Sequence, residues 1–400
     1  MKHSVQMAVV CLFMFVGCRS VPPKVSGITQ PKAYLTVVDA DKAWKAKPKS
    51  TEAWLDLADA LARDNRFPET KDILTRTKIQ FPDDARPYIA LSRIYEQADL
   101  LDLAIDEAQA GCRMEDHSLL ARIRTGELYT GMDWQKRALS TLSGLENECA
   151  PSDRLMWVLA TTAARFQSSD YRGVETALLS LGGDALQVEP LAVLSVDVDI
   201  KQNMLVRARA TCEACMLKFP QNPVFPQRLL QILNRSGKYT EARDFGKAAL
   251  VRFPENVELT YELALAEQGL ENYSQAIKWL EQVVLTRPGY DRSDLILSSL
   301  YMRAGDKITA SRYLTSFRQM ETKHARGTKV ILAVANQPYS SVAHVNAGDF
   351  HMATGRIPRA VVEYREALRL EPNFDTRVRL KNALVRMHRN EPPMPLGEAK

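Results

Sequence analysis

Apolar and small residues recur along this chain with a fixed period, since Pro288 follows Pro254 by 34 residues and both close similar stretches. The clearest period is residues 257–290, and the positions that carry its pattern are Leu263, Ala264, Tyr273, Ala276, Leu280, Val283 and Pro288. Their spacing predicts two amphipathic helices, and the proline ends the second because it cannot continue a helix interior. A period of this length is typical of stacked helix pairs and predicts an all-α, helical-repeat solenoid.

Residues 51–84, 223–256 and 341–374 show the same pattern at matching offsets. Weaker units fill residues 85–118, 119–152, 189–222 and 291–324, and residues 153–188 form a degenerate unit. Small residues open the second helix and let the two helices approach closely; they are Ala242, Ala276, Ala310 and Ala360. Glycines fall at the turn between the helices, where a left-handed residue commonly ends a helix; they are Gly237, Gly305 and Gly355.

These positions resemble the tetratricopeptide repeat, whose motif is a Trp, a Leu-Gly pair, a Tyr, then Ala, Phe, Ala and a closing Pro. The resemblance covers roughly residues 51–390. It implies a right-handed superhelix of antiparallel helix pairs, and it implies protein binding rather than catalysis.

The register predicts a repeat array at residues 51–324, an irregular insertion at 325–340, and a terminal repeat with a capping helix at 341–390. The insertion is either an extra or extended helix that lets the array bend, or a grafted binding element. Residues 391–400, which contain three prolines after Asn390, are expected to be disordered.

The amino terminus resembles a bacterial lipoprotein signal peptide. The apolar run Met7–Gly17 follows Lys2 and is too short to span a bilayer, and Cys18 follows it directly. The resemblance implies that residues 1–17 are removed, that Cys18 is lipidated, and that residues 18–50 form a proline-containing tether. Phe15 departs from the usual Leu of the lipobox, and the alternative is an ordinary signal peptide with an incidental cysteine. Arg19 resembles an outer-membrane sorting signal, so we expect a lipoprotein of the outer membrane that faces the periplasm, or of the plasma membrane in an organism with one membrane.

Composition supports an ordinary folded chain. The sequence is 46% hydrophobic and 25% charged, with a formal net charge of +5 spread along the predicted helices. Nucleic acid is therefore a poor partner class, because the cations form no stripe.

Two constellations resemble catalytic or metal sites. Cys212 and Cys215 form a C-x-x-C motif, but their register places them in the middle of a second helix as small core residues. His344 and His351 share one helix with Asp349, and core packing is again the simpler interpretation. Cys112 and Cys149 lie near the ends of adjacent second helices, farther apart than a disulfide favours. We expect no cofactor, no metal and no enzymatic activity.

The resemblance also implies a concave groove lined by the first helix of each unit. The residues that it selects are Leu55, Ile89, Arg93, Ile123, Trp157, Gln231, Tyr261, Leu265, Leu295 and Met302. Trp157, Tyr261 and Leu295 are the expected apolar anchors for a bound peptide or helix. The alternative is that these positions pack against the next helix of a tightly wound array. The set lacks the repeated Lys and Asn of family members that hold the acidic terminus of heat-shock chaperones.

The sequence therefore predicts a membrane-anchored scaffold or adaptor that binds a protein or peptide in the bacterial cell envelope. A second hypothesis is a pilot or assembly factor for an outer-membrane pilus, pore or secretion component. An enzyme, based on Cys212 and Cys215 or on His344 and His351, is a remote third. The sequence leaves the oligomeric state open.

Overall fold

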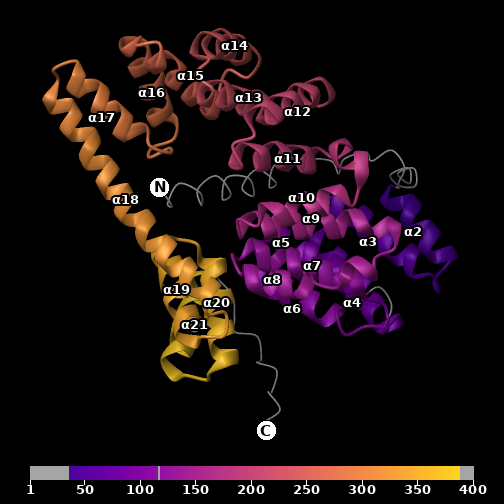
Figure 1. Cartoon of the computed structure of the whole chain (residues 1–400). Coiled ribbons are helices and arrows are strands. Elements are labelled where there is room, and N and C mark those ends of the chain that lie inside the picture. The colour runs from indigo at the N-terminus through magenta and orange to yellow at the C-terminus, as the bar shows by residue number, and fades with distance from the viewer. Residues whose placement is uncertain (1–35, 116–117, 388–400) are drawn as a thin grey trace. The chain divides into compact units, whose positions relative to one another are not determined.

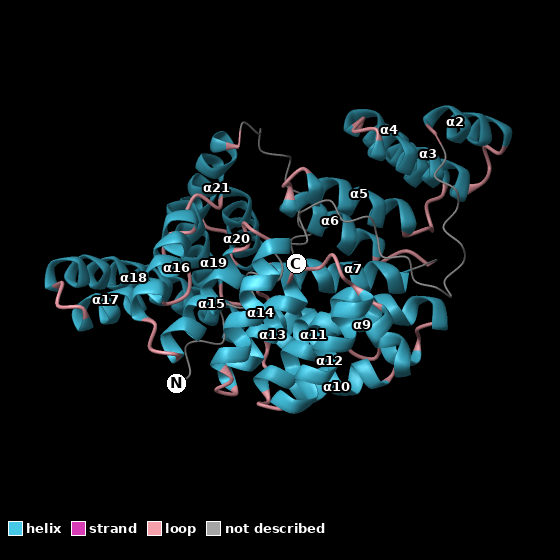
Figure 2. Ribbon diagram, turned by 90° about the horizontal axis from the view of Figure 1, so that it is seen from above, coloured by secondary structure: helices cyan, strands magenta, loops and turns pink. Residues whose placement is uncertain are grey.

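The structure is a computed structural model that describes residues 36–115 and 118–387, where every regular element is a helix (Figures 1 and 2). The predicted signal peptide at residues 1–17, the predicted lipidation at Cys18 and the predicted tail at residues 391–400 lie outside the described part.

Most helices form consecutive pairs joined by short turns, as the repeat pattern predicts. In chain order the helices are α2 (Val37–Ala46), α3 (Thr51–Arg63), α4 (Phe67–Gln80), α5 (Arg86–Gln97), α6 (Leu101–Gly111), α7 (Ser118–Gly131), α8 (Gln135–Leu142), η1 (Leu145–Asn147), α9 (Pro151–Gln167), α10 (Tyr171–Leu179), η2 (Gly182–Gln187), α11 (Glu189–Lys201), α12 (Leu205–Lys218), α13 (Val224–Arg235), α14 (Tyr239–Arg252), α15 (Val257–Gly269), α16 (Tyr273–Thr286), α17 (Ser293–Arg303), α18 (Lys307–Asn336), α19 (Ser341–Ala353), α20 (Ile357–Leu370) and α21 (Phe374–Arg386). The fold class is an all-helical repeat solenoid.

The turn between the two helices of a pair has a left-handed residue at the same repeat position, except in the degenerate α9–α10 pair, where the left-handed residue is Ser169. The predicted glycines adopt it, with φ of 71° at Gly237, 84° at Gly305 and 76° at Gly355. Other repeats use asparagine or aspartate, which tolerate this conformation; they are Asn65, Asp99, Asp133 and Asn203. Glu271 takes the position in the repeat at residues 257–290, with φ of 62°.

The small residues at the start of the second helices are buried between the helices of their pairs. Ala242, Ala276, Ala310 and Ala360 are each 0% exposed. Leucines at helical spacing fill the space around them, such as Leu280 behind Ala276 in one continuous core cluster. The register read from the sequence is therefore confirmed at these core positions.

The described helices form two compact units. One comprises Ser169–Arg326, and the other joins residues 36–168 to residues 327–387. Within the second unit, α20 packs against α6, so the last repeat contacts an early one. Helix α18 begins in the first unit and ends in the second.

Two predicted boundaries differ from the structure. Residues 37–46, assigned to the tether, form helix α2, where Ala40 is buried against Leu57 and Leu61 of α3, and Trp44 packs edge-on against Trp54 at 5.0 Å. The folded array therefore begins before residue 51.

Residues 325–336, assigned to an irregular insertion, continue the 30-residue helix α18, because nothing in Arg326–Asn336 breaks a helix except the tolerated Gly327. Helix α18 therefore extends through residues 325–336.

Candidate functional site

Four of the predicted groove residues are buried inside the repeats. The exposed fraction is 7% for Ile89, 2% for Ile123, 7% for Trp157 and 6% for Tyr261. Side chains buried to this degree are not available as surface anchors for a partner. These four side chains pack inside the array, as the alternative interpretation of a tightly wound array expects.

Two of these residues were expected to anchor a partner, and the structure corrects that expectation. The Trp157 indole nitrogen donates to the Leu142 carbonyl oxygen at 3.1 Å, which satisfies its polar atom within the fold. Tyr261 packs edge-on against Tyr290 with ring centroids 5.2 Å apart. Burial raises the pKa of Tyr261 above its ordinary value, as expected of a phenol in the core.

The remaining groove residues reach the surface to different degrees. Leu55, Gln231, Leu265 and Leu295 are half-buried, Arg93 is exposed, and Met302 is 52% exposed. The third predicted anchor, Leu295, is therefore accessible.

Polar pairs occupy the space between the first helices α11, α13 and α15. Arg228 of α13 pairs with Asp197 of α11. On the other side of α13, Asn234 donates to the Glu262 carboxylate of α15 at 2.9 Å, and burial raises the pKa of Glu262 to about 7. These contacts tie α13 to α11 and to α15 within the fold.

Helix α17 has a pocket at the groove positions that follow. The pocket measures about 360 Å³ and is lined by Leu295, Ser298, Ser299, Met302 and Arg303. Leu295 and Met302, both predicted groove residues, supply its apolar part. Arg303 donates to the Tyr273 hydroxyl at 3.0 Å, which fixes one side of the rim.

A second pocket, of about 430 Å³, lies in the C-terminal repeat. Its lining comes from α19, α20 and α21 and comprises Met352, Tyr364, Arg379, Asn382, Val385 and Arg386. The sequence pattern predicts only a capping helix at residues 377–389, so this pocket was not expected. A signal was present, since Met352 has the same repeat position as Met302, and Arg379 and Arg386 are spaced as Leu295 and Met302 are.

The C-terminal pocket is basic and partly preorganised. The Tyr364 hydroxyl donates to Asp349 at 2.7 Å, and Arg379 pairs with the same carboxylate at 3.2 Å. Burial and then the Asp349 bond raise the pKa of Tyr364. Asn382 and Arg386 are exposed on the same helix, so the pocket combines the apolar Met352 and Val385 with accessible polar groups.

The two candidate reactive constellations are part of the core. Cys212 and Cys215 are free thiols, 0% and 3% exposed, and the Cys212 thiol donates to the Phe225 carbonyl oxygen at 3.0 Å. Burial raises the pKa of Cys212 to about 12, which opposes thiolate chemistry. Cys112 and Cys149 are also free thiols rather than a disulfide.

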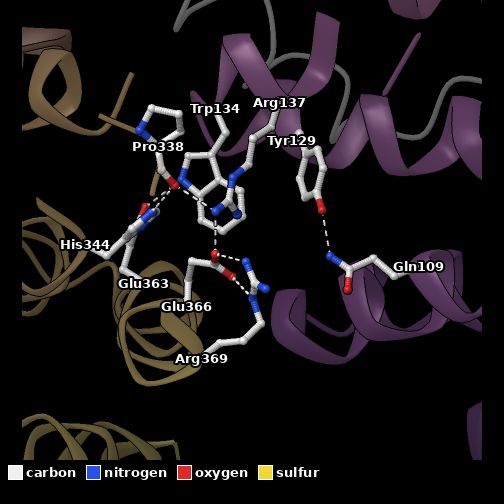
Figure 3. A network of polar contacts seen from close by, with 9 residues as sticks. All are labelled: Gln109, Tyr129, Trp134, Arg137, Pro338, His344, Glu363, Glu366 and Arg369. Atoms are coloured by element: carbon white, nitrogen blue, oxygen red, sulfur yellow. Dashed lines mark hydrogen bonds and ion pairs between the residues drawn. The ribbon is translucent and has the colours of Figure 1, made fainter. Parts of the chain in front are cut away.

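His344 lies where the C-terminal repeat packs on the early repeats, beside Glu363 and Trp134 (Figure 3). His344 Nδ1 lies 2.5 Å from the Glu363 carboxylate, which also accepts the Trp134 indole N–H at 3.1 Å. Beside them, Arg137 of α8 donates to Glu366 of α20 at 2.5 Å. His351 is 2% exposed, and burial lowers its pKa to about 3.

Further ion pairs join α20 to α6 and to the turn before α8. Arg365 pairs with Asp102 at 3.0 Å and with Asp106 at 2.9 Å, and Arg359 pairs with Asp133 at 2.9 Å. The described residues hold no group of three or more His, Cys, Asp or Glu side chains arranged to bind a metal ion. None of the described helices is both long and apolar enough to cross a bilayer.

Comparison with solved structures finds helical proteins of low sequence identity. The Cut9 and Hcn1 hetero-tetramer of APC/C matches with 12% identity and a TM-score of 0.46, over 88% of this chain and 80% of that one. MamA from Desulfovibrio magneticus RS-1 matches with 16% identity and a TM-score of 0.37, over 43% of this chain and 98% of MamA. A thermophilic tetratricopeptide-repeat protein of Thermus thermophilus matches with 20% identity and a TM-score of 0.29, over 49% of this chain and 99% of that one. No functional conclusion follows from these likenesses.

A search of curated proteins found no match to this chain. The family model described as tetratricopeptide repeat matches residues 233–300, which span α14, α15, α16 and most of α17. These residues contain the most regular repeat of the sequence and the α17 pocket residues Leu295, Ser298 and Ser299. Residues 233–300 thus match the tetratricopeptide repeat, a fold that suggests a scaffold for protein–protein interaction.

Proposed function

We propose that this protein is an interaction scaffold whose partner binds at the first-helix pockets of α17 and of the C-terminal repeat. The observation that carries the proposal is that both pockets fall at equivalent repeat positions. Leu295 and Met302 line one, and Met352, Arg379 and Arg386 line the other.

The chemistry of the pockets suits a peptide or helix rather than a small metabolite. Each is lined by apolar side chains together with hydroxyl, amide or guanidinium groups. A partner would place an apolar side chain on Met302 or Met352, whose flexible thioethers adapt to different shapes. Polar groups around such an anchor then fix its orientation.

The test is affinity capture from an extract of the source cells with matched variants. Leu295→Ala with Met302→Ala should reduce recovery of a specific partner by at least tenfold, since truncating an interface anchor typically costs more than 1 kcal/mol. The control is Val38→Ala with Ile79→Ala, which truncates side chains that are 76% and 77% exposed on α2 and α4. Equal recovery by all three proteins would refute the pocket assignment.

We further propose that the scaffold is attached to a bacterial envelope membrane through lipid on Cys18. The support is the sequence Met7–Gly17 followed by Cys18, which resembles a lipoprotein signal. Several acyl chains on one cysteine would give stable attachment, whereas one chain gives only marginal binding.

Replacing Cys18 with serine and fractionating cells tests this anchor. The wild-type protein is expected in the membrane fraction with the lipid mass on Cys18, and Cys18→Ser should remain unprocessed or soluble. Mislocalisation of an outer-membrane client together with the variant would favour the pilot hypothesis instead. Unchanged processing and membrane recovery would contradict lipidation.

A further inference from the structure

Helix α18 concentrates the positive charge of this chain. Five of its residues between 307 and 326 are Lys or Arg, and Glu321 is the single carboxylate among them. This stretch therefore carries +4 of the formal net charge of +5. We call the five residues the α18 cations; they are Lys307, Arg312, Arg318, Lys323 and Arg326.

The α18 cations share one side of their helix. At 3.6 residues per turn they fall within an arc of about 160°, and all five are exposed. The opposite side packs into the repeat, since Ala310 is fully buried and Tyr313 stacks on Tyr301 of α17 with ring centroids 5.8 Å apart. The even spread of cations predicted from the sequence is therefore wrong for this helix, which has a cationic face.

The charge of this face is not neutralised within the described part of the chain. On other helices an exposed cation pairs with a carboxylate one turn earlier, as Arg63 does with Asp59 at 2.9 Å. Arg76 pairs with Asp72 in the same way, also at 2.9 Å. Among the described residues, none forms an ion pair with an α18 cation. The cationic face therefore presents a positive surface that attracts an anionic partner.

The composition of the face favours lipid over nucleic acid. Ile308 lies within the same arc and is 79% exposed. An aliphatic side chain among cations gains by entering the boundary of a bilayer, whereas a phosphate backbone offers it no contact. The exposed arc contains no aromatic residue on which a base could stack.

The geometry of the face suits a flat surface. The α18 cations extend over about 28 Å of one continuous helix, in a row of long side chains. Mobile lipids can move to match any spacing of such a row. The stems of Lys and Arg can also lie along apolar material while their charged ends stay among the headgroups.

We propose that the cationic face of α18 binds the surface of an anionic lipid bilayer, with Ile308 entering the headgroup boundary. A cation near such a surface contributes a factor of about five in affinity. The attraction acts within a Debye length, about 10 Å at 0.1 M salt. The proposal uses no residue of the α17 or C-terminal pockets and does not require lipid on Cys18, so its failure would leave the proposed scaffold function intact.

Co-sedimentation with lipid vesicles tests the proposal. Every protein is the full chain with Cys18→Ser, so that no attached lipid contributes. Binding should be about tenfold or more tighter to equal amounts of phosphatidylglycerol and phosphatidylcholine than to phosphatidylcholine alone. Arg318→Gln with Lys323→Gln should remove most of this difference. The matched control, Arg377→Gln with Lys381→Gln, removes the same charge from exposed positions of α21 and should behave as the parent protein.

Equal binding by the two double variants would overturn the proposal, and so would a parent protein that does not distinguish the two lipid mixtures. High salt should abolish the preference for phosphatidylglycerol, because the Debye length falls to about 3 Å at 1 M.

A second variant separates lipid from nucleic acid. Ile308→Ser should weaken binding to the phosphatidylglycerol vesicles by about threefold or more, because an aliphatic side chain no longer enters the bilayer. Ile79→Ser is its control, since Ile79 is 77% exposed on α4, and it should change nothing. Unchanged binding by Ile308→Ser would contradict the proposed contact. Duplex DNA that binds more tightly than the vesicles, and depends on Arg318 and Lys323, would assign the face to nucleic acid and overturn the proposal.

Discussion

The left-handed turn residue shows how single positions set the stability of each repeat. Asn, Asp and Gly occupy this position at little cost, whereas Glu271 has a Cβ and no short side chain to compensate for its φ of 62°. The repeat at residues 257–290, although the most regular in sequence, therefore carries backbone strain at its turn.

We expect Glu271→Gly to stabilise the protein by about 1 kcal/mol, because glycine removes the left-handed penalty. The measurement is the free energy of unfolding in urea, followed by Trp279 fluorescence at the same repeat. Gly237→Ala is the matched control of opposite sign, since a Cβ there meets no neighbouring atom and tests the backbone alone. A Glu271→Gly variant that is less stable than the wild type would show that the Glu271 side chain stabilises the protein more than the backbone strain destabilises it.

A buried histidine makes stability depend on pH. The folded-state pKa of His351 is lowered to about 3 by burial and then by Arg359 and Arg356, while the unfolded value is 6.5. The unfolded chain therefore binds the proton first, so stability is complete above pH 6.5 and declines as pH falls toward 3.

Replacing His351 with Phe should remove that part of the pH dependence. Between pH 7 and pH 5 the free energy of unfolding of the wild type should fall by about 2 kcal/mol more than that of His351→Phe. This follows because a difference of one pKa unit corresponds to about 1.4 kcal/mol. Urea unfolding at both pH values measures this through Trp134 and Trp157 fluorescence in the same unit. Parallel losses in the two proteins would mean that His351 accepts its proton in the folded state.

At the scale of the element, the packing of α20 on α6 and α8 depends on buried charges. Arg137 and Glu366 are each 7% exposed, and Arg137 also lies 5.0 Å from the Trp134 ring. Breaking one partner of such a pair leaves an uncompensated charge, although Arg369 still contacts Glu366 at 2.6 Å.

We expect Arg137→Met to destabilise this unit by about 3 kcal/mol, at the lower end of the cost of breaking a buried pair. The double variant with Glu366→Met should recover at least about 1 kcal/mol, because no buried carboxylate is then left without its partner. A double-mutant cycle on urea unfolding measures the coupling. If the two substitutions lowered the free energy of unfolding additively in the double variant, the two side chains would act independently.

The repeat register could be predicted from particular residues, and the exposure of each groove position could not. Ala276, Gly237 and Pro288 identify the start, the turn and the end of a repeat through local steric rules that hold in any context. Trp157 and Leu295 share one repeat position, yet one is buried and the other lines a pocket, because only neighbouring helices decide this. The contact of Arg137 with Glu366 joins residues 229 apart, and no periodic signal marks it.

At the scale of the molecule, a repeat array with a C-terminal contact to early repeats has two routes of stabilisation. Residues 169–326 depend on neighbouring repeats, whereas α6 and α8 also depend on α20. Truncating the chain after Asn336 should therefore deprotect α6 and α8 in hydrogen exchange by at least tenfold. Helices α13–α15 should exchange as in the full chain, and a uniform loss across both units would contradict this account.

The central claim is that a partner binds at the first-helix pockets, and site-specific photo-crosslinking in living cells tests it most directly. A photoreactive residue at position 302 should give one discrete adduct with another protein, and so should one at position 386. The same residue at position 79, also well exposed but on α4, should give none. Adducts at position 79 matching those at positions 302 and 386, or no adduct at either pocket, would contradict the assignment.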